Sequence, residues 1–223
     1  MRKFFSPDGS FITIVTKCGD MLIIGLLWIL GSIPLITFGT STAAAYYAAA
    51  KCVRRDTGYP AREFFRAYKR NLKQGILTSL WMLIILGILG LEFYWQYLEA
   101  YTPTAFQILG SRVVLILLLM LLCYVFPVMS RFEMKLPEVY RRAFNLSIRY
   151  WYFTLAILAA GAGLLALQIF VLNIAFILIL PGLWMYLWTF PVEKALQPYM
   201  PQASESDEWY AVPEKKERKK NPK

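Results

Sequence analysis

The sequence predicts an all-α integral membrane protein built as a bundle of transmembrane helices. Of its 223 residues, 58% are hydrophobic and only 17% are charged, and the mean hydropathy is +0.47. Soluble domains of this length seldom have such a composition. The run 150–192 contains no charged side chain at all. As one helix it would rise roughly 65 Å, about twice the ~30 Å hydrocarbon core, so it must fold back once.

Six apolar stretches supply the expected spans, at about 19–36, 40–53, 74–97, 108–130, 150–172 and 174–191. The second is the shortest, and as a helix it would rise only ~21 Å. If it does not cross the membrane, the number of spans falls to five. Gln168 and Asn173 mark the expected turn of the last hairpin. Pro181 with Gly182 is expected to kink the last span, because proline removes a helical hydrogen-bond donor.

Two further segments, 61–73 and 136–149, carry an apolar face and a basic face at helical spacing. Such amphipathic helices are typical of segments that lie in the plane of an anionic membrane surface. Residues 1–197 are therefore expected to form a single membrane domain with two interfacial helices. Residues 198–223 are polar, with an acidic block followed by a basic one, and we expect a disordered charged tail.

The net charge of +10 is explained by Lys and Arg side chains placed beside the spans, where anionic lipid headgroups lie. Nucleic-acid binding is not needed to explain it. Eight Lys or Arg side chains fall in 51–73 and five in 131–149, whereas the connection between the third and fourth spans holds only Arg112. The positive-inside rule then predicts that both basic segments, and with six spans both termini, are cytoplasmic.

Chemistry-bearing residues are scarce. The chain has no His, which excludes a His general base, a His metal ligand and a Ser-His-Asp triad. Cys18, Cys52 and Cys123 are far apart and form no CxxC motif. There is also no phosphate-binding glycine loop and no HExxH motif. We expect no enzymatic activity, no cofactor and no metal site.

The first candidate segment follows the first span and combines a helix break with hydroxyl groups. Its hydroxyls are candidate helix N-caps, or ligands for a solute at a broken helix. The Ala-rich stretch 43–50 after it has small residues at four-residue spacing, which predicts close packing between helices. The candidate residues are Pro34, Thr37, Gly39, Thr40, Ser41 and Thr42.

Two other groups are candidates. Glu92, Gln96 and Glu99 share a helical face near the outer end of the third span; they are suited to a cation or to sugar hydroxyls, and a solvated interface is the favoured interpretation. In "FPVMSRFE", Pro127 is expected to bend the chain at the cytoplasmic interface. Arg131 and Glu133 are expected to pair with the first basic helix.

The letters Phe-Pro-Val occur twice, at 126–128 and 190–192, each time at the end of an apolar run. Both copies follow the order amphipathic segment, span, span. This order predicts a parallel internal repeat about an axis along the membrane normal. Convergence from shared membrane constraints remains an alternative explanation.

Several stretches together resemble the YesL family of bacterial membrane proteins: "PLITFGTSTAAAYYAAAKCVRRD", "FFRAYKRNLKQ", "YVFPVMSRFE" and "AFNLSIRY". The resemblance runs from Phe4 to about Pro191. That family is a domain of unknown function, so the resemblance implies a multi-pass protein of the bacterial plasma membrane, often associated with sugar ABC-transporter genes, and no catalytic residue. Its recurrent positions here are Pro34, Thr37, Gly39, Ser41, Phe126, Pro127, Arg131, Phe132 and Glu133.

Two functions are consistent with these features. The first is a non-enzymatic accessory component of bacterial carbohydrate uptake. It would pack through the small-residue helix against a sugar ABC permease, another membrane protein or a second copy of the chain. The second is a small-solute transporter or facilitator in its own right. Ion-coupled carriers usually keep a charged group deep in the membrane, and spans three to six have none.

Overall fold

The computed structural model describes residues 10–98, 104–170 and 178–200, and all regular structure in these ranges is helical. The predicted all-α class is confirmed. The main helices are α1 (Ser10–Ser32), α2 (Phe38–Ala48), α3 (Pro60–Tyr97), α4 (Ala105–Arg131), α5 (Leu136–Arg149), α6 (Trp151–Phe170) and α7 (Leu180–Leu196). Short turns lie at Leu35–Thr37 and Gln197–Tyr199, and a π-helix at Ala49–Val53. Glu99, Asn173 and the predicted tail from 201 onward lie outside the described residues.

Four helices in the described ranges are long and apolar enough to cross a membrane: Ile12–Ser32, Pro60–Tyr97, Ala105–Arg131 and Trp151–Ile169. These helices indicate a membrane-spanning protein. Two of the six expected spans are shorter. The predicted span 40–53 lies within the 11-residue α-helix Phe38–Ala48 and the five π-helical residues Ala49–Val53 that follow it, and α7 has 17 residues. An 11-residue helix rises only about 16 Å, roughly half of the hydrocarbon core.

Helix α2 lies inside the molecule, packed against α1, α3, α4 and α7. Every side chain from Gly39 to Ala48 is buried. The small residues predicted close helix packing, and they provide it within the chain. This corrects the expected mechanism, because no side chain of that stretch is left on the surface to contact a permease.

The first amphipathic segment is not a separate interfacial helix. Residues 61–73 continue into the third predicted span as one 38-residue helix, α3. No proline interrupts the stretch 61–97, and Gly75 is held in the helix by its contact with α2. Phe64 and Ala67 of the segment are buried against the protein, whereas Phe65 is exposed, so only part of its apolar face is used for tertiary packing.

The second amphipathic segment is a separate helix, α5, but its apolar face also packs on the protein. Val139, Ala143 and Leu146 are buried, and α5 lies against α4. Phe144 and Ile148 lie outside this buried face and are exposed. The predicted amphipathic pattern is therefore correct, and most of its apolar face is used for tertiary packing.

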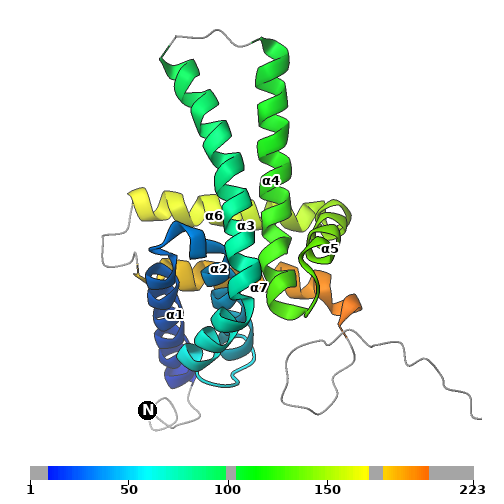
Figure 1. Ribbon diagram of the computed structural model, residues 1–223. Helices are drawn as coiled ribbons and strands as arrows, with labels where there is room; N and C mark the ends of the chain where they lie inside the picture. Colours follow the sequence, from blue (N-terminus) through cyan, green and yellow to red (C-terminus); the bar gives the residue numbers. More distant parts are fainter. Residues whose placement is uncertain (1–9, 99–103, 171–177, 201–223) are drawn as a thin grey trace, which may run out of the picture.

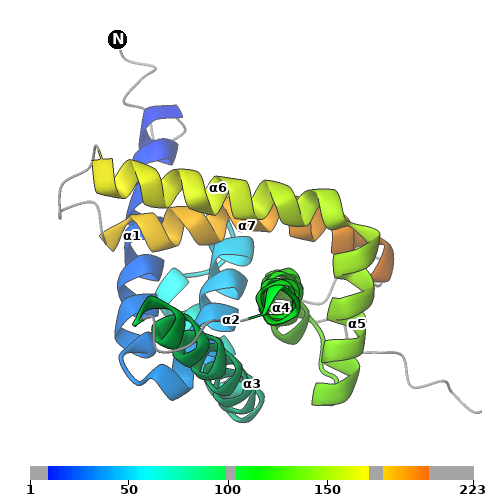
Figure 2. The ribbon, with the colours of Figure 1, turned by 90° about the horizontal axis from the view of Figure 1, so that it is seen from above.

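Helices α3 and α4 form a long hairpin that stands above the rest of the molecule (Figure 1). Helices α6 and α7 lie side by side and run across this hairpin, as seen from the front and from above (Figure 2). The two predicted repeat units therefore do not share a hairpin direction. The physical reason lies at Tyr150, where the backbone leaves the helical conformation between α5 and α6. At the equivalent place, α3 continues as one helix.

The prolines also differ from expectation. Pro181 lies in the first turn of α7, where its missing N–H is not needed, so it starts that helix and does not kink it. Pro127 and Pro191 lie inside α4 and α7, which continue for several residues past them. Neither Phe-Pro-Val segment ends its helix.

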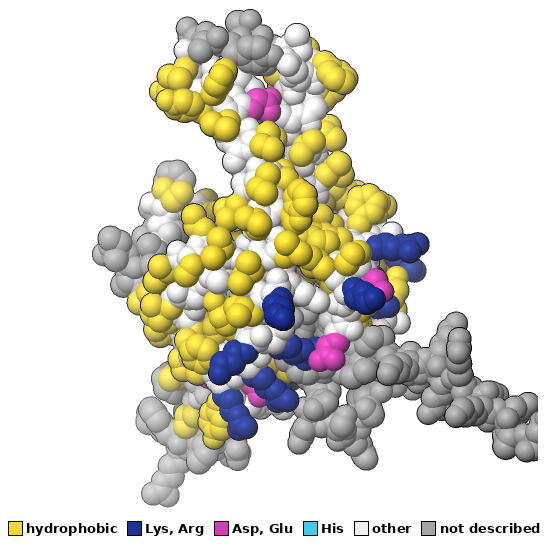
Figure 3. Space-filling model, in the orientation of Figure 1, with side chains coloured by type: hydrophobic (Ala, Val, Ile, Leu, Met, Phe, Trp, Pro, Cys, Tyr) yellow, Lys and Arg dark blue, Asp and Glu magenta, His cyan; other side chains and the backbone are white. Residues whose placement is uncertain are grey.

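Charged and apolar side chains are separated on the surface. On the face shown in Figure 3, Lys and Arg gather at the lower part of the molecule, and hydrophobic side chains cover the α3–α4 hairpin above them. This distribution matches the basic segments that the sequence places at 51–73 and 131–149. The lower part of the molecule, which carries the basic segments 51–73 and 131–149, is called the base below.

Candidate functional site

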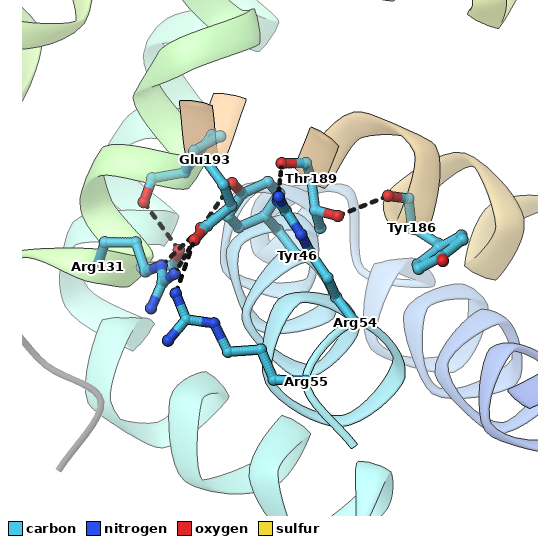
Figure 4. A network of polar contacts seen from close by, with 9 residues as sticks. Tyr46, Arg54, Arg55, Arg131, Tyr186, Thr189 and Glu193 are labelled. Atoms are coloured by element: carbon cyan, nitrogen blue, oxygen red, sulfur yellow. Dashed lines mark hydrogen bonds and ion pairs between the residues drawn. The ribbon is translucent and has the colours of Figure 1, made fainter. Parts of the chain in front are cut away.

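The most unusual feature of the base is a buried ion pair between the two Phe-Pro-Val segments. Arg131 of α4 donates to both carboxylate oxygens of Glu193 of α7, with Nε at 2.8 Å from Oε1 (Figure 4). The two side chains are only 3% and 6% exposed. A buried pair of this kind is tolerated because the two-pronged geometry satisfies both charges at once.

Two further groups reach the same carboxylate. The hydroxyl of Tyr46, on the buried helix α2, donates to Glu193 at 3.1 Å. Arg55 approaches from the 54–59 loop, with Nη2 at 3.8 Å from Oε2. Burial and the neighbouring charge of Arg131 lower the pKa of Arg55, because each disfavours a second cation there. The site thus joins α2, α4, α7 and the loop around one acid.

Arg54 is held beside this network by a different set of contacts. Its Nη1 donates to the backbone oxygen of Thr189 at 2.6 Å, and its guanidinium lies 5.0 Å from the centre of the Phe190 ring. Phe190 belongs to the second Phe-Pro-Val segment. The cation therefore ties the 54–59 loop to α7 at the place where Pro191 weakens the helix.

Pro127 creates a second polar requirement in α4. A proline has no N–H, so the carbonyl four residues earlier, that of Cys123, loses its helical partner. The indole N–H of Trp188 on α7 donates to this carbonyl at 3.1 Å. The cross-helix bond satisfies a group that would otherwise be left unpaired among apolar side chains.

The hydroxyl segment after α1 is used for folding. The Thr37 hydroxyl donates to the carbonyls of Gly31 and Pro34, both at 2.8 Å, and the Thr42 hydroxyl to that of Phe38 at 2.8 Å. Thr40 donates to the Leu72 carbonyl at 3.4 Å. The Ser41 hydroxyl is buried and has no hydrogen-bond partner among the described atoms.

Helix α2 begins at Phe38, so the predicted N-caps at 40–42 lie inside the helix and not at its start. Thr37, at the cap position, makes no side-chain cap. The free N–H of Gly39 is instead bound by the Ser79 hydroxyl of α3, at 2.7 Å. A side chain 40 residues away therefore does the work expected of a local cap.

This contact is part of a close crossing of α2 and α3. A Cβ added to Gly75 would come within 2.7 Å of the backbone nitrogen and Cα of Thr40. A Cβ on Gly39 would lie 2.8 Å from the Ser79 hydroxyl. The glycines let the two backbones approach, as small residues do at membrane helix interfaces.

The outer polar group is small. Gln96 donates to Glu92 at 3.1 Å on α3, which satisfies part of the carboxylate. Glu92 lines a pocket of about 500 Å³ between α3 and α4, together with Gln107 and Ser111 of α4. The third member of the predicted group, Glu99, lies outside the described residues.

The expected pairing of Arg131 and Glu133 with the first basic segment is found for Glu133 alone. Glu133 pairs with Arg70 of the first basic segment at 3.0 Å, and the carboxylate is 55% exposed. Arg131 points away from that segment to Glu193. The sequence analysis did not single out Glu193, Tyr46 or Arg54. The signal for Glu193 was present, since it is the first charged side chain after the uncharged run 150–192.

The outer face of the α3–α4 hairpin is apolar and contains unfilled positions. Gly87 and Gly90 of α3 and Gly110 of α4 are exposed, and no other described side chain or packed backbone lies within 4 Å of a Cβ added to them. Large exposed side chains, including Ile84 and Leu91, lie beside the two glycines of α3. By contrast, Gly25, Gly39, Gly75 and Gly182 lie in close contact with other parts of the chain.

Residues 21–93 match the model of a family described as "Protein of unknown function, DUF624". The match covers the second half of α1, the whole of α2 and most of α3; the helices from α4 onward lie outside it. The chain is similar to that family over this stretch. No curated protein and no solved structure gave a match. Within the described residues, no three His, Cys, Asp or Glu side chains lie together as a metal ion requires.

Proposed function

We propose that the protein is a non-enzymatic accessory component of a bacterial membrane complex for carbohydrate uptake. In this proposal the base is a rigid support held by the Arg131–Glu193 pair. The α3–α4 hairpin is the part that contacts a partner within the bilayer. The partner is a membrane protein, and a sugar ABC permease is the one we propose.

The observation that carries the proposal is the outer face of the hairpin. Gly87 and Gly90 are one helical turn apart on a face that large apolar side chains border. Inside the chain, Gly39 and Gly75 have the same small size, and a second helix fills the space above them. Exposed glycines on a membrane helix are the positions at which another helix approaches most closely.

The carbohydrate link rests on the resemblance to the YesL family and on nothing in the geometry. The match of residues 21–93 to a family of unknown function is compatible with that resemblance and names no substrate. The proposed location is the plasma membrane, with the basic base and both termini in the cytoplasm. The charge distribution along the chain supports this orientation through the positive-inside rule.

The hydrogen bonds of the hydroxyl segment favour the interaction function over the alternative of an independent solute transporter. Its binding segment would be the hydroxyls at 37–42, and three of these donate to carbonyls of the same chain. We therefore propose the interaction function first and keep solute flux as its competitor in the experiment.

The test is purification of the tagged full-length protein from its native membrane in a mild detergent, followed by mass spectrometry of the proteins that accompany it. We expect a stoichiometric membrane partner, and a permease subunit of a sugar ABC transporter in particular. The amount of partner that co-purifies with the double variant Gly87→Leu/Gly90→Leu should be at least about ten times lower than with the wild type. Its own fold should persist, because the added side chains point into open space.

The matched control is Gly163→Leu on α6, another exposed glycine with no packed neighbour within 4 Å. It should retain the partner. Recovery of the chain alone from native membranes, together with solute flux in liposomes, would replace this proposal by the transporter alternative. Equal loss of the partner in both glycine variants would show that the hairpin face is not the contact.

A further inference from the structure

We propose that the groove between α6, α7 and the 54–59 loop binds one anionic phospholipid, with its phosphate at Arg55 and Lys194 and an acyl chain along the two helices. The proposal rests on the membrane location of the chain and not on the carbohydrate partner. It arises from a pocket that the ion-pair network borders but does not fill.

The pocket has a volume of about 860 Å³. This is within the ~300–1,000 Å³ range of ligand pockets in proteins. Its walls come from one face of α6 and one face of α7. On α6 the lining residues are Phe153, Ala156, Ile157 and Ala160, which recur at helical spacing.

The α7 wall runs from Trp184 to Lys194, and ten residues of helix extend about 15 Å. One end of the groove, at Trp184 and Ala160, is wholly apolar. The other end carries the charged side chains. A ligand that fills the groove must therefore be an amphiphile with a long apolar part and a polar head.

The polar end is cationic. Arg54, Arg55 and Lys194 line it, and Glu193 is the one acid among the lining residues. That acid faces both Arg131 and Arg55, so one carboxylate is shared between two cations, and the three lining cations outnumber it. Burial, followed by the neighbouring charges of Arg131 and Arg54, lowers the pKa of Arg55. A phosphate diester adds negative charge at this cation-rich end and accepts hydrogen bonds from several cations at once.

The cationic end of the groove is open to solvent. Arg55 has a side chain that is 52% exposed, and Lys194 is exposed too. A headgroup could therefore enter from the membrane surface without opening the fold. Trp188 and Phe190 lie between the charged end and the apolar end, where aromatic side chains suit the boundary between headgroup and acyl chain.

The experiment measures lipid binding to the purified, delipidated full-length protein by native mass spectrometry. The probes are phosphatidylglycerol, phosphatidylcholine and inorganic phosphate. We expect phosphatidylglycerol to bind at least about five times more tightly than phosphatidylcholine, and phosphate alone not to bind at the same concentrations. Equal binding of the two lipids would overturn the proposal, and so would phosphate binding as tight as that of the anionic lipid.

The charge variant is Arg55→Gln/Lys194→Gln, and its matched control is Arg62→Gln/Lys69→Gln, two exposed basic residues of α3 that do not line the groove. The first should weaken phosphatidylglycerol binding by about five- to twentyfold, and the control should change it less than twofold. Equal effects would mean that general attraction to a basic surface explains the binding, against the proposal. Lys194→Gln alone guards against a folding defect and should give roughly a fivefold loss.

The apolar end is tested by Ala160→Phe, which fills the groove, against Ala159→Phe, an exposed neighbour on α6 outside it. Ala160→Phe should reduce binding of the anionic lipid and Ala159→Phe should not. A loss in Ala160→Phe without any loss in the charge variant would assign the groove to a neutral ligand and contradict the proposal.

Discussion

Arg131 and Glu193 lie four and two residues after the prolines of the two Phe-Pro-Val segments, and they meet in a buried ion pair. The repeated Phe-Pro-Val sequence therefore lies where α4 and α7 contact each other through this ion pair. Tyr46 of the buried helix α2 donates to the same carboxylate. One acid thus connects three helices that are distant in the sequence.

Removing the acid should destabilise the base strongly. Glu193→Gln leaves the guanidinium of Arg131 buried without its counter-charge, and breaking a buried pair in this way costs about 3–5 kcal/mol. We expect a much lower thermal unfolding midpoint of the purified protein in detergent. Gln keeps the shape of the side chain, but it replaces one accepting oxygen by an NH2 donor, so the charge and one of the two hydrogen bonds from Arg131 are lost together.

Two controls separate charge from packing. Glu133→Gln breaks the exposed pair with Arg70 and should cost no more than about 1 kcal/mol. The double variant Arg131→Met/Glu193→Leu should recover part of the stability lost in Glu193→Gln, because neither member of the buried pair is left without its counter-charge. Recovery is incomplete because Tyr46 and Arg55 lose their contact with the carboxylate. A single acid variant as stable as the wild type would contradict the role given to the pair.

The hydrogen bond from Trp188 to the Cys123 carbonyl predicts a coupling with Pro127. Trp188→Phe removes the donor and leaves the carbonyl unsatisfied, at a cost of about 1–3 kcal/mol. Pro127→Ala restores a helical N–H for the same carbonyl. In that background, Trp188→Phe should cost clearly less.

A double-mutant cycle on thermal stability measures this coupling. Additive effects of the two substitutions would show that the indole bond does not compensate for the proline.

The glycines of α3 predict opposite results along one helix. Gly75→Ala places a Cβ 2.7 Å from the backbone of Thr40, so α2 and α3 must separate, at about 1–3 kcal/mol or more. Gly87→Ala adds the same methyl group in open space and should be neutral or slightly stabilising, because alanine favours helix. Thermal unfolding of the two variants side by side tests the crossing. Equal effects would be inconsistent with it.

Part of this fold could be predicted from the sequence alone. The all-α class and the apolar helices follow from composition and from the length of uncharged runs. The two basic amphipathic segments were also recognised, because helical periodicity is a local property. Their packing was not, since an apolar face has the same pattern whether it meets lipid or, as for Val139 and Phe64, another helix.

The position of α2 and the ion pair depended on contacts between distant residues. Tyr46 and Glu193 are 147 residues apart, and no local pattern connects them. The small residues of α2 correctly predicted close packing, but they do not say against which helix. The hydrogen bond from the Gly39 N–H to Ser79 is a similar case, because a capping hydroxyl 40 residues away leaves no local pattern in the sequence.

The orientation in the membrane is tested by single-cysteine labelling in cells whose three native cysteines have been replaced. Thr104, at the start of α4, and Arg62, at the start of α3, are both exposed and lie at opposite ends of the hairpin. An impermeant maleimide should label Thr104→Cys in intact cells and Arg62→Cys only after lysis. The reverse pattern would place the base outside the cell.

The most direct measurement of the proposed function is photo-crosslinking in native membranes, with a photoreactive amino acid at Leu91 on the hairpin. Leu165 on α6 is the control, because it is also apolar and similarly exposed, at 63% against 61%. We expect a protein adduct of one defined mass at Leu91 and none of that mass at Leu165. Lipid adducts alone at Leu91, or the same protein adduct at both positions, would contradict a partner docked on the α3–α4 hairpin.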